Sequence, residues 1–150
     1  MNYGCEAAIG AVCGLRTFTG PAIVARAANR NGLKTPFAWL ASDRAAGTAT
    51  LLAAGELIAD KLPFMPNRTA VSGLAARFIS GAICGMAIAG RRKPGEKIIS
   101  GIVGGAAAVA AAYAGYGYRK HVKLPPLAAA LLEDAVAVGA GAAVVASLCP

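Results

Sequence analysis

The chain has 150 residues with 15 Lys and Arg against 7 Asp and Glu, a net charge of +8, and its hydrophobic content is 57%. Charged residues make up 15%, where about 25% is usual for a soluble globular domain. The basic residues fall between apolar runs, as charges that flank membrane spans do, and not in a polar, aromatic-rich patch, so we expect no nucleic-acid partner and instead a lipid bilayer.

Five apolar segments follow one another along the chain, each close to or above the ~20 residues that cross about 30 Å of hydrocarbon. Within the first segment, Gly20 and Pro21 predict a break into two half-helices, because Pro removes a backbone donor and clashes with the preceding turn. Short separators rich in turn residues predict a single transmembrane domain over residues 1–150, an all-α polytopic membrane helix bundle of about five spans. The segments are residues 3–28, 36–62, 70–90, 97–118 and 126–148.

Five crossings predict which loops share a side of the membrane. The loops near residues 30 and 93 would lie on one side, and those near 66 and 121 on the other. Seven Lys and Arg on the first side against five on the second weakly favour a cytoplasmic first side, with the N-terminus outside. Cys5 and Cys149 would then lie on opposite faces, which predicts no disulfide between them.

Ionisable side chains within the apolar segments mark a candidate site. Each would cost at least about 2.5–3.5 kcal/mol at mid-bilayer, so they should face inward, pair with one another or lie near the interface. In the five-span topology they gather in one leaflet and in the middle of the membrane. They either line a pathway or only tie helices together as ion pairs. The six residues are Arg16, Glu56, Asp60, Arg77, Glu133 and Asp134.

The stretch "GELIAD" places Glu56 and Asp60 four residues apart, on one face of a helix. We expect both carboxylates to face the bundle interior and to meet Arg16 or Arg77 directly. Arg68, in the loop that follows, should fold back toward the same carboxylates.

Small residues spaced four apart predict closely packed helices, because they let backbones approach one another. Whether these rows serve the fold or a homo-oligomer is open at this point. The rows are Gly10 and Gly14, Gly81 and Gly85, Gly101 and Gly105, and Ala135 and Gly139.

Catalytic and metal-binding patterns are missing from the sequence. None of the four cysteines form a CxxC pair, and His121 has no partner at ligand spacing, so we expect no metal site and no cofactor. No Ser-His-Asp set is evident, so we expect no enzyme; a lipid-head-group enzyme that uses the carboxylates is a third possibility behind the two described below.

Five stretches, "GLRTFTGPA", "GELIADKLPFMPNRT", "GLAARFISGAICG", "AGYGYRK" and "LLEDAVAVG", resemble in this order the bacterial integral membrane proteins of domain of unknown function family 4126. The resemblance covers nearly the whole chain and includes Arg77, Glu133 and Asp134. It implies a small multi-span protein of the bacterial inner (plasma) membrane and implies no activity. Its most specific part is a Glu-x-x-x-Asp-Lys-x-Pro motif followed by Pro-x-Arg-Thr, here Glu56, Asp60, Lys61, Pro63, Pro66, Arg68 and Thr69.

Two classes of function fit these features. The first is a small inner-membrane transporter or channel for an ion or small polar solute, in which a broken helix frees backbone groups for coordination. Four acids against two arginines among the six intramembrane residues slightly favour a cation or proton, and so few spans favour a homo-oligomer. The second is a structural or accessory membrane protein whose charged cluster only locks helices and whose partner carries the activity. The substrate stays unknown.

Overall fold

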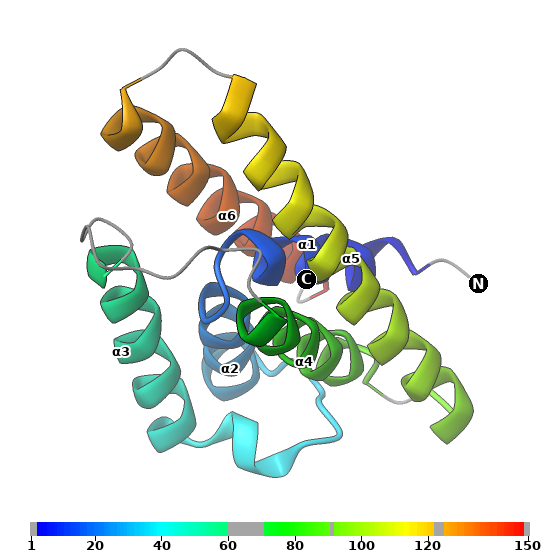
Figure 1. Cartoon of the computed structure of the whole chain (residues 1–150). Helices are drawn as coiled ribbons and strands as arrows, with labels where there is room; N and C mark the ends of the chain where they lie inside the picture. The colour runs from blue at the N-terminus through cyan, green and yellow to red at the C-terminus, as the bar shows by residue number, and fades with distance from the viewer. Residues whose placement is uncertain (1–2, 60–70, 91, 122–124, 149–150) are drawn as a thin grey trace.

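The computed structural model describes residues 3–59, 71–90, 92–121 and 125–148. Within these ranges the chain is an all-α bundle without strands, which confirms the predicted fold class (Figure 1). The elements are α1 (Gly4–Leu15), α2 (Thr19–Arg30), the 3-10 helix η1 (Ala38–Ala41), α3 (Asp43–Ala59), α4 (Val71–Ile88), α5 (Pro94–His121) and α6 (Pro126–Leu148).

Three helices of the described chain are long and apolar enough to cross a membrane. They are α4, α5 and the Leu127–Leu148 part of α6, with 18, 28 and 22 residues. The expected second segment becomes η1 followed by α3, which has 17 residues and carries Asp43 and Arg44 in its first turn. The expected first segment becomes two helices of 12 residues each, so the estimate of five spans was approximate.

The helix break expected at Gly20 and Pro21 lies four residues earlier, at residues 16–18. Arg16 ends α1 with extended backbone angles, φ −141° and ψ 111°. Gly20 and Pro21 lie in the first turn of α2, where Pro is tolerated because those N–H groups have no intrahelical partner in any case. Gly20 is needed for packing, since a Cβ there would overlap the sulfur of Cys13.

The α1–α2 pair turns back on itself instead of crossing the bundle. At its start, the guanidinium of Arg92 lies 5.0 Å from the centre of the Tyr3 ring. Just beyond its end, the carbonyl oxygen of Lys34 lies close to Gly90, where an added Cβ would be 3.1 Å from it. Both ends therefore lie beside the segment that follows α4, on the side of the loops near residues 30 and 93. We expected the N-terminus on the side opposite to these two loops. The contacts correct this and place it on the same side.

The predicted cysteine arrangement changes with this hairpin. Cys5 lies at the start of α1, on the same side as the residue 31–34 connection, where Leu148 lines a shared pocket with Leu33 and Gly90. Cys149 itself lies outside the described residues. Because α6 leads back to this side, the reason given for expecting no Cys5–Cys149 bond no longer holds.

Glycines let α1 and α4 approach the backbone of α5, as their spacing predicted. A Cβ on Gly10 would lie 2.8 Å from the Cα of Gly104, and one on Gly81 would lie 2.5 Å from the Gly104 carbonyl oxygen. Gly14 and Gly85 continue the two rows against Ala108 and Ser100. Close backbone approach of this kind drives helix association in lipid, where burial of apolar side chains contributes little.

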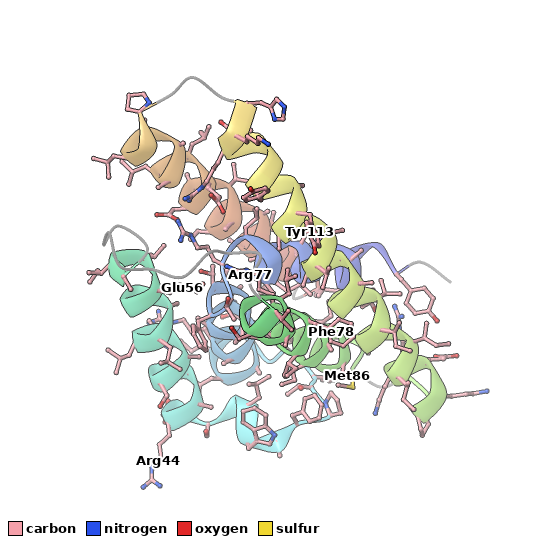
Figure 2. All side chains as sticks on the ribbon, viewed as in Figure 1. Arg44, Glu56, Arg77, Phe78, Met86 and Tyr113 are labelled. Atoms are coloured by element: carbon pink, nitrogen blue, oxygen red, sulfur yellow. The ribbon has the colours of Figure 1, made fainter. Side chains whose placement is uncertain are left out.

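The other predicted rows of small residues behave differently. Gly101 and Gly105 receive the side chains of Met86 and Phe78 from α4, both labelled in Figure 2. Gly139 of α6 faces open space, with nothing within 4 Å of a Cβ there. The three rows Gly10–Gly14, Gly81–Gly85 and Gly101–Gly105 therefore serve the fold, and the Ala135–Gly139 row is left on an outer face.

The helix α3 stands to one side of the bundle, next to α2 (Figure 1). Ala46 and Ala53 are buried on it, and the guanidinium Nε of Arg26 donates to the Thr50 hydroxyl at 3.0 Å. Its outer face is apolar and exposed, with Leu51 and Ile58 at 75% and 68% exposure. Packing between α3 and α4 is correspondingly sparse in the described part of the chain.

Candidate functional site

The break between α1 and α2 is the point on which side chains from three other helices converge. Arg16, at the break, is 1% exposed, and its guanidinium Nη2 pairs with Oδ1 of Asp134 from α6. A guanidinium keeps its charge when buried, so this pair joins two opposite charges away from solvent. The contact fixes the end of α1 against α6.

Glu56 of α3 binds the backbone that the break exposes. Its Oε1 accepts a hydrogen bond from the N–H of Thr17 and its Oε2 one from the N–H of Phe18, each at 2.8 Å. These N–H groups precede α2 and have no intrahelical partner, and a negative charge at the N-terminus of a helix is favoured by the helix dipole. A carboxylate from another helix thus caps α2.

The partner of Glu56 differs from the expected one. Glu56 extends from α3 toward the central region that also holds Arg77, as predicted (Figure 2). Within the described part of the chain, however, its carboxylate is bound by amides and not by the guanidinium of Arg16 or Arg77. The physical reason is that a broken helix leaves N–H groups that must be satisfied, while Arg16 already pairs with Asp134. Asp60 and Arg68 lie outside the described residues.

Ser80 and Arg77 approach the same break from α4. The Ser80 hydroxyl donates to the carbonyl of Thr17 at 2.5 Å, which satisfies a second backbone group of the break. Arg77 lies one turn earlier on the same face of α4, and both residues are 8% exposed. The guanidinium of Arg77 is therefore buried on the side of the bundle that contains the break.

The pair Glu133 and Asp134 splits between two partners. Being adjacent, they point about 100° apart around α6. Glu133 pairs with Arg119 of α5, whose Nη2 and Nε lie 2.7 Å and 2.9 Å from its Oε2. Sequence interpretation treated Arg119 only as a loop charge. Glu133 also borders an otherwise apolar pocket of about 300 Å³ between α5, α6 and Leu15.

A further buried acid, Glu6, was missed among the intramembrane charges. It is 2% exposed, and its Oε1 lies 2.8 Å from Nη1 of Arg92 and 3.4 Å from the Ser100 hydroxyl. The signal was present, since Glu6 lies in an apolar segment and the cost of an unpaired charge there applies to it equally. As a result α1 carries an ion pair at each end, Glu6 with Arg92 near its start and Arg16 with Asp134 at the break.

Metal-binding geometry is not found in the part of the chain that the structure describes, where no cluster of three or more His, Cys, Asp and Glu could hold an ion. Cys5, Cys13 and Cys84 are free thiols. The described carboxylates are held by amide and guanidinium groups. The expected absence of a metal and a cofactor stays a prediction.

Comparison with known proteins identifies a family. A family described as "Domain of unknown function (DUF4126)" matches residues 4–149. No curated protein and no solved structure matches the chain.

Proposed function

Because the chain belongs to the family described as Domain of unknown function (DUF4126), whose description names no activity, we propose from its geometry that it is a small membrane transporter or channel for an ion or small polar solute. The observation that carries the proposal is the break at residues 16–18, where two half-helices meet carboxylates from α3 and α6 and a hydroxyl from α4. Transporters commonly bind their cargo at such discontinuous helices, because free backbone groups there can coordinate it.

Glu56 is the group that we propose exchanges partners during transport. Glu133 and Asp134 each face an arginine, so protonating either would break an ion pair. Glu56 faces two neutral amides in the described structure, so a proton or cation can neutralise it without breaking an ion pair. This supports a proton or a cation as the cargo.

The helix α3 is the element that would respond. A neutral carboxyl group accepts a weaker hydrogen bond than a carboxylate, so uptake of a proton would loosen the contact between Glu56 and the break. Since α3 packs mainly against α2 and η1, its far end can shift without unpacking α4 from α5. Release of Thr17 and Phe18 N–H groups would then open the break to the cargo.

The test is flux through the purified protein in proteoliposomes. The wild type is expected to carry protons or a monovalent cation, and Glu56→Gln is expected to abolish this flux while retaining the fold, since an amide oxygen can still accept one of the hydrogen bonds. Glu96→Gln, in the first turn of α5 and away from the break, is the matched control and should transport like the wild type. Unchanged flux in Glu56→Gln would refute the role of this carboxylate.

We also propose a homo-oligomer in the bacterial inner membrane. So small a bundle has few spans to enclose a pathway, and the exposed apolar faces of α3 and α6, including Leu51, Ile58 and Leu131, offer surfaces to lipid or to another copy. The expectation that the protein is no enzyme stays a prediction.

A structural or accessory role is the second candidate, and a specific observation favours it. The described carboxylates of the site are bound by guanidinium or amide groups, and the pocket beside Glu133 is almost entirely apolar. Such a cluster can lock helices without passing an ion. A folded wild-type protein that carries no flux across a panel of protons, alkali cations and halides would support this role and refute transport.

A further inference from the structure

A groove between α3 and α4 borders the break, because Thr17, Phe18 and Ser80 line it, but no charged side chain does. Its volume is about 420 Å³. Small-molecule sites typically have volumes of about 300–1,000 Å³, so the groove lies within this range. Ala49 and Leu52 line it from α3, Ile79 and Ile83 from α4, and Trp39 from η1. The exposed surface of this lining is apolar. The groove therefore suits a hydrocarbon occupant.

The helix α3 stands beside α2 (Figure 1) and packs only sparsely on α4 in the described part of the chain, so both walls of the groove are left partly uncovered. Leu52 and Ile79 remain 46% and 57% exposed on its two walls. Water in a groove without polar partners is poorly held. In a bilayer, the apolar group that reaches such an opening from the side is a lipid acyl chain.

The stretch of chain that contains Trp39, from Arg30 to Arg44, carries three basic residues against one acid. The connection from α2 to α3 exposes Arg30, Lys34 and Arg44. Its acid, Asp43, accepts a hydrogen bond from the amide of Asn29 at 3.2 Å. Arg44 extends away from the bundle at the start of α3, next to Ala45, which lines the groove (Figure 2). Clusters of Lys and Arg beside a membrane helix attract anionic head groups, and Trp favours the same depth.

We propose that this groove is a binding site for an anionic phospholipid. One acyl chain lies between α3 and α4, and the phosphate lies beside Arg44 and the α2–α3 connection. The proposal does not depend on transport, because it concerns an apolar groove and a cationic rim and not the carboxylates of the break.

Trp39 permits a direct test, because it is the single tryptophan of the chain and lines the groove. The protein is reconstituted in phosphatidylcholine vesicles with increasing fractions of a phospholipid brominated on its acyl chains, which quenches nearby tryptophan. We expect brominated phosphatidylglycerol to reach half-maximal quenching at a fraction about fivefold lower than brominated phosphatidylcholine, the preference that one cationic side chain at a membrane surface supplies. Arg44→Gln should remove most of that preference.

Ala49→Phe fills the groove from α3 and should abolish the preference, whereas Ala54→Phe, on the exposed side of the same helix, should retain it. Equal quenching by the two lipids in the wild type would overturn the proposal, as would equal behaviour of the two Phe variants. A preference that disappears when the protein is diluted in the membrane would assign the groove to a second copy and also overturn it. If Ala49→Phe does not fold, native mass spectrometry of the wild type decides: retained phosphatidylglycerol supports the site, and its complete loss during mild detergent exchange refutes it.

Discussion

Arg16 and Asp134 form an ion pair that ties the broken helix near the N-terminus to the last helix of the chain. The side chain of Arg16 is 2% exposed and that of Asp134 13%. Because both charges are withdrawn from solvent, each depends on the other for its stabilisation. The pair therefore offers a direct measure of how strongly the break is held in place.

Removing one member of this pair should destabilise the protein more than removing both. Arg16→Ala leaves Asp134 buried without that partner and should lower the free energy of unfolding by about 3–5 kcal/mol. The double variant Arg16→Ala with Asp134→Ala should recover part of that loss. Unfolding in mixed detergent micelles, followed by circular dichroism, measures both. If the double variant loses as much free energy of unfolding as the two single variants together, the two residues are not coupled.

Gly104 should tolerate no side chain, because α1 and α4 both contact the backbone of α5 there. Gly104→Ala places a Cβ 3.2 Å from the Cα of Gly85 and into the carbonyl of Gly81, and backbone atoms cannot move aside cheaply. We expect a loss of about 1–3 kcal/mol in the free energy of unfolding.

The matched control for this substitution lies in the same helix. Gly117 has nothing within 4 Å of the position that a Cβ would take, so Gly117→Ala should gain up to about 1 kcal/mol from helix propensity. Thermal unfolding of both variants in the same detergent compares them. Similar melting temperatures for the two would refute the close backbone packing around Gly104.

Because α1 and α2 form a hairpin, the structure predicts which introduced cysteines a reagent can label from the same side of the membrane. In a variant whose native cysteines are replaced by Ala, Gly4→Cys, Asn31→Cys and Lys93→Cys should all react with an impermeant maleimide from one side. His121→Cys should react from the other side, since α5 separates Lys93 from His121. A full crossing by residues 3–28 would place Gly4 with His121 instead. Labelling of oriented vesicles from each side distinguishes the two topologies.

Much of the architecture followed from the sequence alone. Long runs of Ala, Gly, Val and Leu can satisfy their backbone groups in lipid only as helices, so the composition determined the helical bundle and roughly where each helix lies. The rows Gly10–Gly14 and Gly81–Gly85 indicated close packing, because only small residues permit such contacts. The cost of buried charge marked Arg16, Arg77 and Glu133 as inward-facing before any contact was known.

The tertiary structure decided where the first helix breaks and which charges meet. Residues 16–18 contain neither Gly nor Pro, so local sequence preference did not mark them. Their N–H groups are satisfied by Glu56, which lies 39 residues from Thr17 along the chain, and such a partner exists only once α3 packs against α2. The same holds for Arg16 and Asp134, since each buried charge could have been matched by several opposite charges. Helix formation depends on neighbouring residues, whereas the turn-back and the ion pairs depend on which helix ends meet in space.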